Sequence, residues 1–270
     1  MILSAARDTL RTARRIVVKV GTSTLAHAKT GKLNLYRIEQ LIRELADLHN
    51  AGREIIFVSS GAIATGMDKL GIKVKPETIP ENQALAAIGQ GVLMHIYEKF
   101  FAEYGQTMAQ FLLTKENAAD LHARENFHNA MSTVLNMGVI PVINENDAVT
   151  VDEIRIGDND NLSAIVAAMV NAEVLIILSD IDGLFDGNPK VDKSARLIDE
   201  VPEINSAVEQ MAGGVGTKLG TGGMFTKIQA AKLATANGVT MLIVNGETVG
   251  NLRLALSGEV VGTIFPAKKS

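Results

Sequence analysis

The sequence predicts an α/β fold in which helices cover both faces of a mostly parallel sheet. Short apolar runs rich in Val, Ile and Leu alternate along the chain with amphipathic helical stretches. The runs are nearly continuous in apolar residues, which indicates strands that are buried on both faces. Because crossovers between parallel strands are right-handed, the helices are expected in two layers, as a three-layer αβα sandwich.

Six segments have the length and composition of strands. They comprise residues 15–20, 54–59, 107–113, 139–143, 174–178 and 239–244. The segments between them show helical periodicity. These comprise residues 35–52, 61–70, 81–104, 116–137, 162–170 and 225–237, and the polar segment 147–160 is expected to form a short excursion or hairpin.

No linker, repeat or low-complexity tract divides the chain, so residues 15–270 are expected to form a single domain. Residues 1–14 form an N-terminal extension before the first strand. Residues 1–15 carry four Arg and one Asp, with apolar residues at roughly helical spacing. The acidic residue and the short length favour a surface helix over a transit peptide.

Composition argues against several classes of function. The formal net charge is −4 and the chain has eight Phe, three Tyr and no Trp, so no nucleic-acid partner is expected. No apolar run approaches the ~20 residues of a membrane-spanning helix. The absence of Cys excludes disulfides, thiolate catalysis and Cys-ligated zinc. A cytoplasmic protein without a membrane partner is expected.

Polar residues gather where the predicted strands end. Lys19, Ser60, Asn144 and Asp180 lie in or directly after four different strands. Ligands of open parallel sheets bind beyond the carboxyl ends of the strands, so these ends are expected to form one site.

Two of these strand ends have the features of a phosphate site. Lys19 lies in a strand that is otherwise expected to be buried, and Gly21 would let a phosphate approach. The structural alternative is a lysine paired with a carboxylate such as Asp180. Ser60 and Gly61 lie between a strand and a helix, where backbone N–H groups bind anions, although Ser60 is alternatively a simple N-cap.

The segment 213–227 holds six of the 24 glycines and opens a predicted helix. Lys227 falls in the first turn of that helix, where the helix macrodipole disfavours a cation. A cation at a glycine-rich helix start indicates that an anion binds there. The alternative is a flexible loop without a ligand.

Acidic and amide side chains concentrate in residues 144–147 and 157–161. Carboxylates and amide carbonyls suit a substrate ammonium group, and they also hold Mg²⁺ directly or through water. Such residues form turns through local hydrogen bonds as well. The pattern does not divide Asp147, Asp158 and Asp160 between an amine and a metal, and the metal ligands stay unassigned.

Several common catalytic motifs are absent. The sequence has no HExxH, no GxSxG, no GxxxxGK[ST] and no GxGxxG after a strand. The five His show no pairing that suggests a metal site or a general base. P-loop and dinucleotide-binding functions therefore lose support.

Six motifs together resemble the glutamate 5-kinases of the amino acid kinase family. They are KVGTSTL at 19–25, SSGAIATG at 59–66, NENDAV at 144–149, GDNDNLSA at 157–164, LSDIDGLF at 178–185 and GTGGMFTK at 220–227. Some are shared by other amino acid kinases, but NENDAV, GDNDNLSA and GTGGM together are more specific to glutamate 5-kinases. Many relatives carry a PUA domain after the kinase domain, and none is expected here because the sequence ends at Ser270. Ser59 and Ser179 stand where Thr is common.

The resemblance implies phosphorylation of the L-glutamate side chain by Mg-ATP, giving L-glutamyl 5-phosphate in the first step of proline synthesis. It implies catalytic roles for Lys19 and Lys227, and glutamate contacts from Ser60, Asp147 and Asn159. The implied nucleotide contacts, besides both lysines, are Ser179, Asp180, Thr221, Gly222, Gly223, Met224, Phe225 and Thr226. Secondary candidates from the residue pattern are Gly21, Gly61, Asn144, Asp158 and Asp160. Feedback inhibition by proline and a homo-oligomer, a dimer or tetramer, are also implied.

A carboxylate acceptor agrees with the residues present. A glutamate side chain with a pKa near ~4.3 is already ionised at neutral pH and needs no general base. Two lysines, glycine-loop amides and Mg²⁺ are the parts needed to neutralise and position the phosphoryl group.

Other functions remain as alternatives. Kinases of acetylglutamate, aspartate, carbamate or UMP are the nearest alternative enzymes. An acetylated amine would need no acidic partner, so the acidic residues argue against acetylglutamate. UMP would call for phosphate-binding Arg residues near the acceptor site, and none stands out there. A non-catalytic amino-acid sensor with the same fold is an alternative from another class. A nicotinamide dehydrogenase would need the missing glycine fingerprint.

Overall fold

The computed structural model describes residues 4–150, 159–189, 191–213 and 223–268. The chain divides into two compact units, which we call the terminal unit (Met1–Lys19 with Asp160–Ser270) and the middle unit (Val20–Asn159). The chain therefore passes from one unit to the other at two peptide bonds. The single domain expected over residues 15–270 stays a prediction.

The middle unit contains three parallel strands in the order β3-β4-β2. They are β2 (Glu54–Ser59), β3 (Met108–Leu113) and β4 (Ile140–Glu145). Every residue of β4 is buried, and because successive side chains of a strand point to opposite faces, both faces of β4 are covered. The described helices of this unit are α2 (Thr22–Leu25), α3 (Leu35–Asn50), α4 (Ala62–Leu70), α5 (Ile79–Glu103), α6 (Lys115–Ala119) and α7 (Leu121–Asn136).

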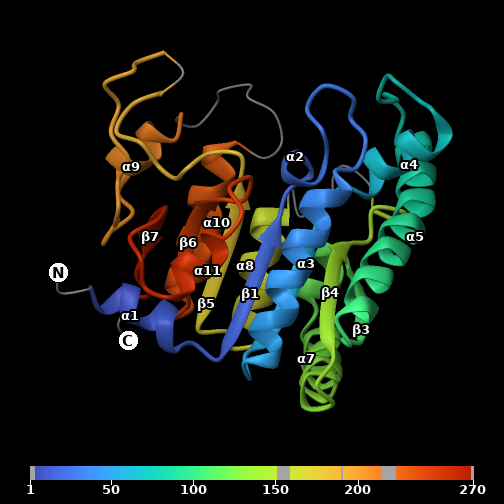
Figure 1. Ribbon diagram of the computed structural model, residues 1–270, viewed down its shortest axis with the longest axis horizontal. Helices are drawn as coiled ribbons and strands as arrows, with labels where there is room; N and C mark the ends of the chain where they lie inside the picture. Colours follow the sequence, from blue (N-terminus) through green and yellow to red (C-terminus); the bar gives the residue numbers. More distant parts are fainter. Residues whose placement is uncertain (1–3, 151–158, 190, 214–222, 269–270) are drawn as a thin grey trace. The chain divides into compact units, whose positions relative to one another are not determined.

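The terminal unit contains strands in the order β1-β5-β6-β7. They are β1 (Arg15–Val20), β5 (Val174–Ser179), β6 (Thr240–Asn245) and β7 (Thr263–Phe265). β5 and β6 are parallel, β6 and β7 are antiparallel, and β5 is buried along its whole length. The described helices are α1 (Ala5–Thr12), α8 (Asn159–Met169), α9 (Ser206–Met211), α10 (Met224–Ala236) and α11 (Asn251–Leu256), of which α10 and α11 lie beside β6 (Figure 1).

The predicted fold class is confirmed, because mostly parallel strands are covered by helices on both faces. All six predicted strands are present with ends that differ by at most two residues. The three-residue strand β7 is too short to produce a periodic pattern, and it was not predicted. The single helix predicted over residues 116–137 is wrong. Asp120 has an extended backbone and its side chain accepts a hydrogen bond from the Ala123 N–H at 2.7 Å, so it separates α6 from α7 as a helix cap.

Helices α4 and α5 pack against each other at unusually short range (Figure 1). A Cβ atom at Gly89 would lie 1.8 Å from the carbonyl oxygen of Ala62, and one at Gly66 would lie 2.1 Å from that of Leu85. Only glycine permits this approach. It fixes where the side chains of α5 lie relative to the start of α4.

Helix α1 is fastened to the terminal unit by a buried cation. Leu10 is fully buried, and Arg7 is 3% exposed. The Arg7 guanidinium donates hydrogen bonds to the carbonyl oxygens of Asp199, Val261 and Gly262 at 2.9, 2.7 and 3.1 Å.

Among the described residues, no helix is long and apolar enough to cross a membrane.

Candidate active site

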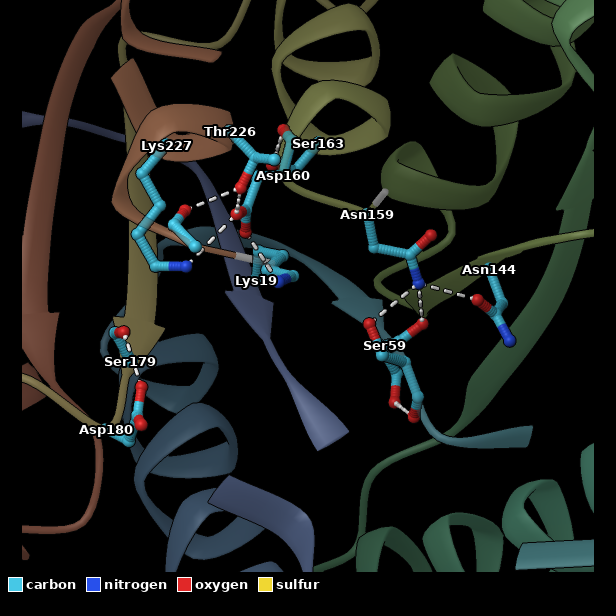
Figure 2. A network of polar contacts seen from close by, with 12 residues as sticks. Lys19, Ser59, Asn144, Asn159, Asp160, Ser163, Ser179, Asp180, Thr226 and Lys227 are labelled. Atoms are coloured by element: carbon cyan, nitrogen blue, oxygen red, sulfur yellow. Dashed lines mark hydrogen bonds and ion pairs between the residues drawn. The ribbon is translucent and has the colours of Figure 1, made fainter. Parts of the chain in front are cut away.

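A buried carboxylate joins two buried lysines in the terminal unit (Figure 2). The Nζ atom of Lys19 lies 2.5 Å from Oδ1 of Asp160, and the Nζ atom of Lys227 lies 3.1 Å from Oδ2. Each ammonium group therefore contacts a different oxygen of one carboxylate. The three side chains carry a formal charge of 2 − 1 = +1 in a place shielded from water.

Three elements that are distant in sequence supply these side chains. Lys19 lies at the end of β1, Asp160 in the first turn of α8, and Lys227 in the first turns of α10. Ser163, one turn further along α8, donates from Oγ to the backbone carbonyl oxygen of Asp160 at 2.6 Å. The tertiary fold is thus required to assemble the cluster.

The electrostatic balance at Asp160 favours its charged form. Burial by itself raises the pKa of this carboxyl, but the charges of Lys19 and Lys227 and hydrogen bonds from Lys19 and Thr226 together outweigh it. The pKa of Asp160 therefore lies below its ordinary value. The carboxylate is negative at neutral pH and holds both ammonium groups.

The start of α10 is tied to the same carboxylate. The Oγ1 atom of Thr226 lies 2.8 Å from Oδ2 of Asp160 and 2.7 Å from the carbonyl oxygen of Gly223, so two acceptors share one hydroxyl hydrogen. Gly223 is the N-cap of α10 and provides no side-chain cap. Met224 and Phe225, both half-buried, complete this helix start, where backbone N–H groups suit an anion.

Ser179 and Asp180 form a separate pair at the end of β5. Ser179 is buried and donates from Oγ to Oδ1 of Asp180 at 3.2 Å, whereas Asp180 itself is exposed. The buried partner of Lys19 is accordingly Asp160, and not Asp180 as the structural alternative had suggested.

In the middle unit, the amide of Asn159 connects the ends of two strands (Figure 2). Its Nδ2 atom lies 2.8 Å from the Ser59 carbonyl oxygen, 2.9 Å from Ser60 Oγ and 2.8 Å from Asn144 Oδ1. Three acceptors therefore compete for two hydrogens. Since Ser60 Oγ accepts in this contact, its own hydroxyl hydrogen can be donated elsewhere.

The two glycines predicted near the site have different roles. Gly61 has φ +102° at the N-cap of α4, in the left-handed region that favours glycine. Gly21 has φ −89° at the N-cap of α2, a conformation that any residue adopts. The backbone requirement for glycine therefore applies to Gly61.

Asp147 lies on the wall of a cavity of about 260 Å³ in the middle unit. Glu145 and Asn146 line the cavity beside it, with Ala62 and Ala86 among the apolar residues of the wall. Ser60, Asn144 and Asn159 form one hydrogen-bonded group in the same unit, and Asp147 is placed on the cavity.

Some sequence predictions change in the structure or fall outside it. Asp158, Thr221 and Gly222 lie outside the described residues. Asp160, which the pattern grouped with ammonium or metal ligands, contacts two lysines instead. The reason is that successive side chains of a helix point about 100° apart, so Asp160 and its neighbour Asn159 enter different networks.

One polar residue of this region was missed by the sequence reasoning. Gln90 of α5 accepts a hydrogen bond at Oε1 from Asn144 Nδ2, at 2.8 Å. Helical spacing places Gln90 on the same face as Ala86, Leu93 and Tyr97, all of which are buried. A buried amide on an apolar stripe needs a polar partner, and that was the available signal.

Comparison with known proteins identifies the family. The amino acid kinase family model matches residues 14–245. The glutamate 5-kinase of Clostridium acetobutylicum is 55% identical over 259 residues, which are 96% of this chain and 97% of the relative. The chain belongs to the glutamate 5-kinases of the amino acid kinase family.

Two further glutamate 5-kinases are similar over almost the whole chain. That of Clostridium perfringens is 51% identical over 267 residues, covering 97% of this chain and 99% of the relative. That of Carboxydothermus hydrogenoformans is 56% identical over 266 residues, covering 97% of this chain and 70% of the relative.

Solved structures with low sequence identity share the fold. The UMP kinase of Bacillus anthracis has a TM-score of 0.65 at 16% identity, covering 96% of this chain and 98% of that one. An isopentenyl phosphate kinase has a TM-score of 0.62 at 19% identity, covering 93% and 99%. At such identities the likeness shows the amino acid kinase fold alone.

Proposed function

We propose that this chain transfers the γ-phosphoryl group of ATP to the side-chain carboxylate of L-glutamate, giving L-glutamyl 5-phosphate and ADP in the first step of proline biosynthesis. The observation that carries the proposal is the pair of buried lysines held by one carboxylate. Two buried ammonium groups suit a transferring phosphoryl group, because the transition state spreads negative charge over its oxygens.

The nucleotide side of the reaction is assigned to the terminal unit. Lys19 and Lys227 neutralise the phosphate oxygens, and Asp160 acts as a positioning residue that keeps both ammonium groups in place. The start of α10 binds the phosphates through its backbone N–H groups. The further residues proposed to contact the nucleotide are Ser179, Asp180, Thr221, Gly222, Gly223, Met224, Phe225 and Thr226.

The acceptor side is assigned to the middle unit. The glutamate carboxylate is ionised at neutral pH, so one of its oxygens attacks the γ-phosphorus while the bond to the ADP oxygen breaks. Ser60 and Asn159 position the reacting end of the substrate, and Asp147 holds the α-ammonium group. No proton has to be removed from the acceptor, which agrees with a site built from lysines, amides and hydroxyls.

Mg²⁺ enters the proposal with ATP. Among the described residues, no group of three or more His, Cys, Asp or Glu side chains is placed so that it could hold a metal ion. Both oxygens of Asp160 contact ammonium groups instead. These residues do not fit a dedicated metal site. A metal carried mainly by the nucleotide phosphates is the usual arrangement for Mg²⁺.

Three further proposals follow from membership of the family. They are feedback inhibition by proline, assembly into a homo-oligomer, and a cytoplasmic location. The first is tested by adding proline to the activity assay, and the second by sedimentation at several protein concentrations.

Trapping the product with hydroxylamine tests the activity directly. The protein is incubated with Mg-ATP, hydroxylamine and either glutamate, N-acetylglutamate, aspartate or no acceptor, and the acyl hydroxamate is measured. Hydroxamate from glutamate alone is expected. Absence of hydroxamate with every acceptor, from protein that binds ATP, would refute the kinase and favour an amino-acid sensor.

A further inference from the structure

The cavity of the middle unit has an acidic and amide lining. Its volume of about 260 Å³ is several times the roughly 30 Å³ that one water molecule occupies in the liquid, so it is large enough for a small molecule. Glu145 and Asp147 supply carboxylates, and Gln90, Gln110 and Asn146 supply amides. Among the described residues that line it, none is Lys, Arg or His. Among these side chains, the groups that can donate to a ligand's carboxylate are the amides.

The orientation of the Gln90 amide is fixed by its neighbours. The backbone N–H of Glu145 donates to the side-chain oxygen of Asn144 at 2.9 Å, and a backbone N–H can only donate. The opposite atom of that side chain is therefore the nitrogen, which donates to Gln90 at 2.8 Å. The atom of Gln90 that accepts is consequently Oε1. Its Nε2 must point away from Asn144.

The Nε2 atom of Gln90 is buried and has no hydrogen-bond partner among the described residues. The Gln90 residue as a whole is 9% exposed, and it lies on the cavity wall. A buried donor without a partner is unfavourable, since it has lost its water without gaining a protein acceptor. As the side chain lies, this atom is not accessible from the cavity, so Nε2 reaches an acceptor atom of a ligand there after a rotation of the Gln90 side chain toward the cavity.

We propose that Gln90 binds the amino-acid substrate, donating from Nε2 to an oxygen of its α-carboxylate. This inference rests on the proposed function, because it assigns one contact of the glutamate substrate. The reacting side-chain carboxylate must stay accessible to phosphorus, and the α-ammonium group is matched by the acidic lining. The α-carboxylate is then the group that still needs a donor, and Gln90 supplies a buried one. Through Oε1 and Asn144, the same side chain is also linked to Asn159.

The two ends of the Gln90 amide can be separated by substitution. Gln90→Glu keeps an oxygen that accepts from Asn144 but replaces the donor with a second acceptor. Gln90→Met has a side chain of similar length but loses both the acceptor oxygen and the donor nitrogen. Hydroxamate formation is measured against glutamate and ATP concentration for each protein, and thermal melts report whether each variant is folded.

Gln90→Glu is expected to raise KM for glutamate by on the order of 10- to 100-fold, the usual effect of losing a hydrogen bond to a charged group. Its kcat and its KM for ATP should stay within about threefold, which is ~0.7 kcal/mol at 1.4 kcal/mol per tenfold. An unchanged KM for glutamate in folded Gln90→Glu refutes the proposal, even where Gln90→Met is impaired, because only positioning through Asn144 is then left. Failure of the wild-type protein to form hydroxamate would instead refute the proposed function.

A change in the ligand gives an independent readout that does not need Gln90→Glu to fold. The compound 4-aminobutyrate keeps the ammonium group and the reacting carboxylate but lacks the α-carboxylate. Its inhibition constant is measured by competition with glutamate in the wild type and in Gln90→Met. The substitution is expected to weaken the binding of glutamate at least tenfold more than the binding of 4-aminobutyrate. Equal weakening of both compounds would overturn the assignment to the α-carboxylate.

Discussion

The Asp160→Asn substitution removes one negative charge and preserves the size of the side chain. In the wild type, the fully buried Asp160 carboxylate contacts the Nζ atoms of Lys19 and Lys227 at 2.5 and 3.1 Å. Asparagine still offers one oxygen to Thr226 or to a lysine, but it leaves two buried ammonium groups without this counter-charge. Removing one partner of a buried ion pair costs about 3–5 kcal/mol, and the same loss of stability is expected here at pH 7.

The effect should depend on pH with a defined sign. The pKa of Asp160 is lowered in the folded protein, so its stabilisation is present above the ordinary value of 3.8 and disappears as the pH falls through the folded value. The wild-type carboxyl is protonated at sufficiently low pH and then resembles the amide. The difference in the free energy of unfolding between wild type and Asp160→Asn should therefore become smaller below pH 3.8.

Urea unfolding followed by circular dichroism measures both effects, since the chain has no Trp for fluorescence. Glu203→Gln is the matched control, because it makes the same chemical change at an exposed position of the terminal unit. That variant should stay within about 0.5 kcal/mol of the wild type. If Asp160→Asn lowers the free energy of unfolding by less than about 1 kcal/mol at pH 7, or by an amount that does not change with pH, the reasoning is refuted.

Three further predictions concern the site and its scaffold. Lys227→Ala should lower kcat by ~10²-fold or more in the hydroxamate assay, because a transition-state charge contact is lost, and near-normal kcat would exclude that role. Asp147→Ala should chiefly raise KM for glutamate, and an unchanged KM would remove it from the substrate site. Gly89→Ala should destabilise the protein by about 1–3 kcal/mol in urea titrations, since its Cβ would lie 1.8 Å from the Ala62 carbonyl oxygen. Gly91→Ala, on the same helix with nothing within 4 Å, should instead stabilise by up to about 1 kcal/mol, and equal effects of the two would contradict the packing argument.

The sequence by itself determined the fold class, the strands and the residue types of the site. Strand periodicity and helix signals depend on neighbouring residues, so β2 (Glu54–Ser59) was predicted residue for residue. Lys19 and Lys227 could be selected because each breaks a local rule, a charge in a buried strand and a cation at a helix start. Such conflicts are visible without knowing what lies nearby.

Only the tertiary structure decided which side chains meet. Asp160 and Lys227 are 67 residues apart in the chain, and no local pattern indicates that their side chains lie in contact. Asn159 and Asp160 are consecutive, yet they enter different networks because a helix turns each side chain away from the last. Gln90 has no motif at all, and its unpartnered donor becomes evident only when α5 packs beside the end of β4. Pairing, burial and the direction of a side chain are properties of the packed chain, and they are what the sequence does not encode locally.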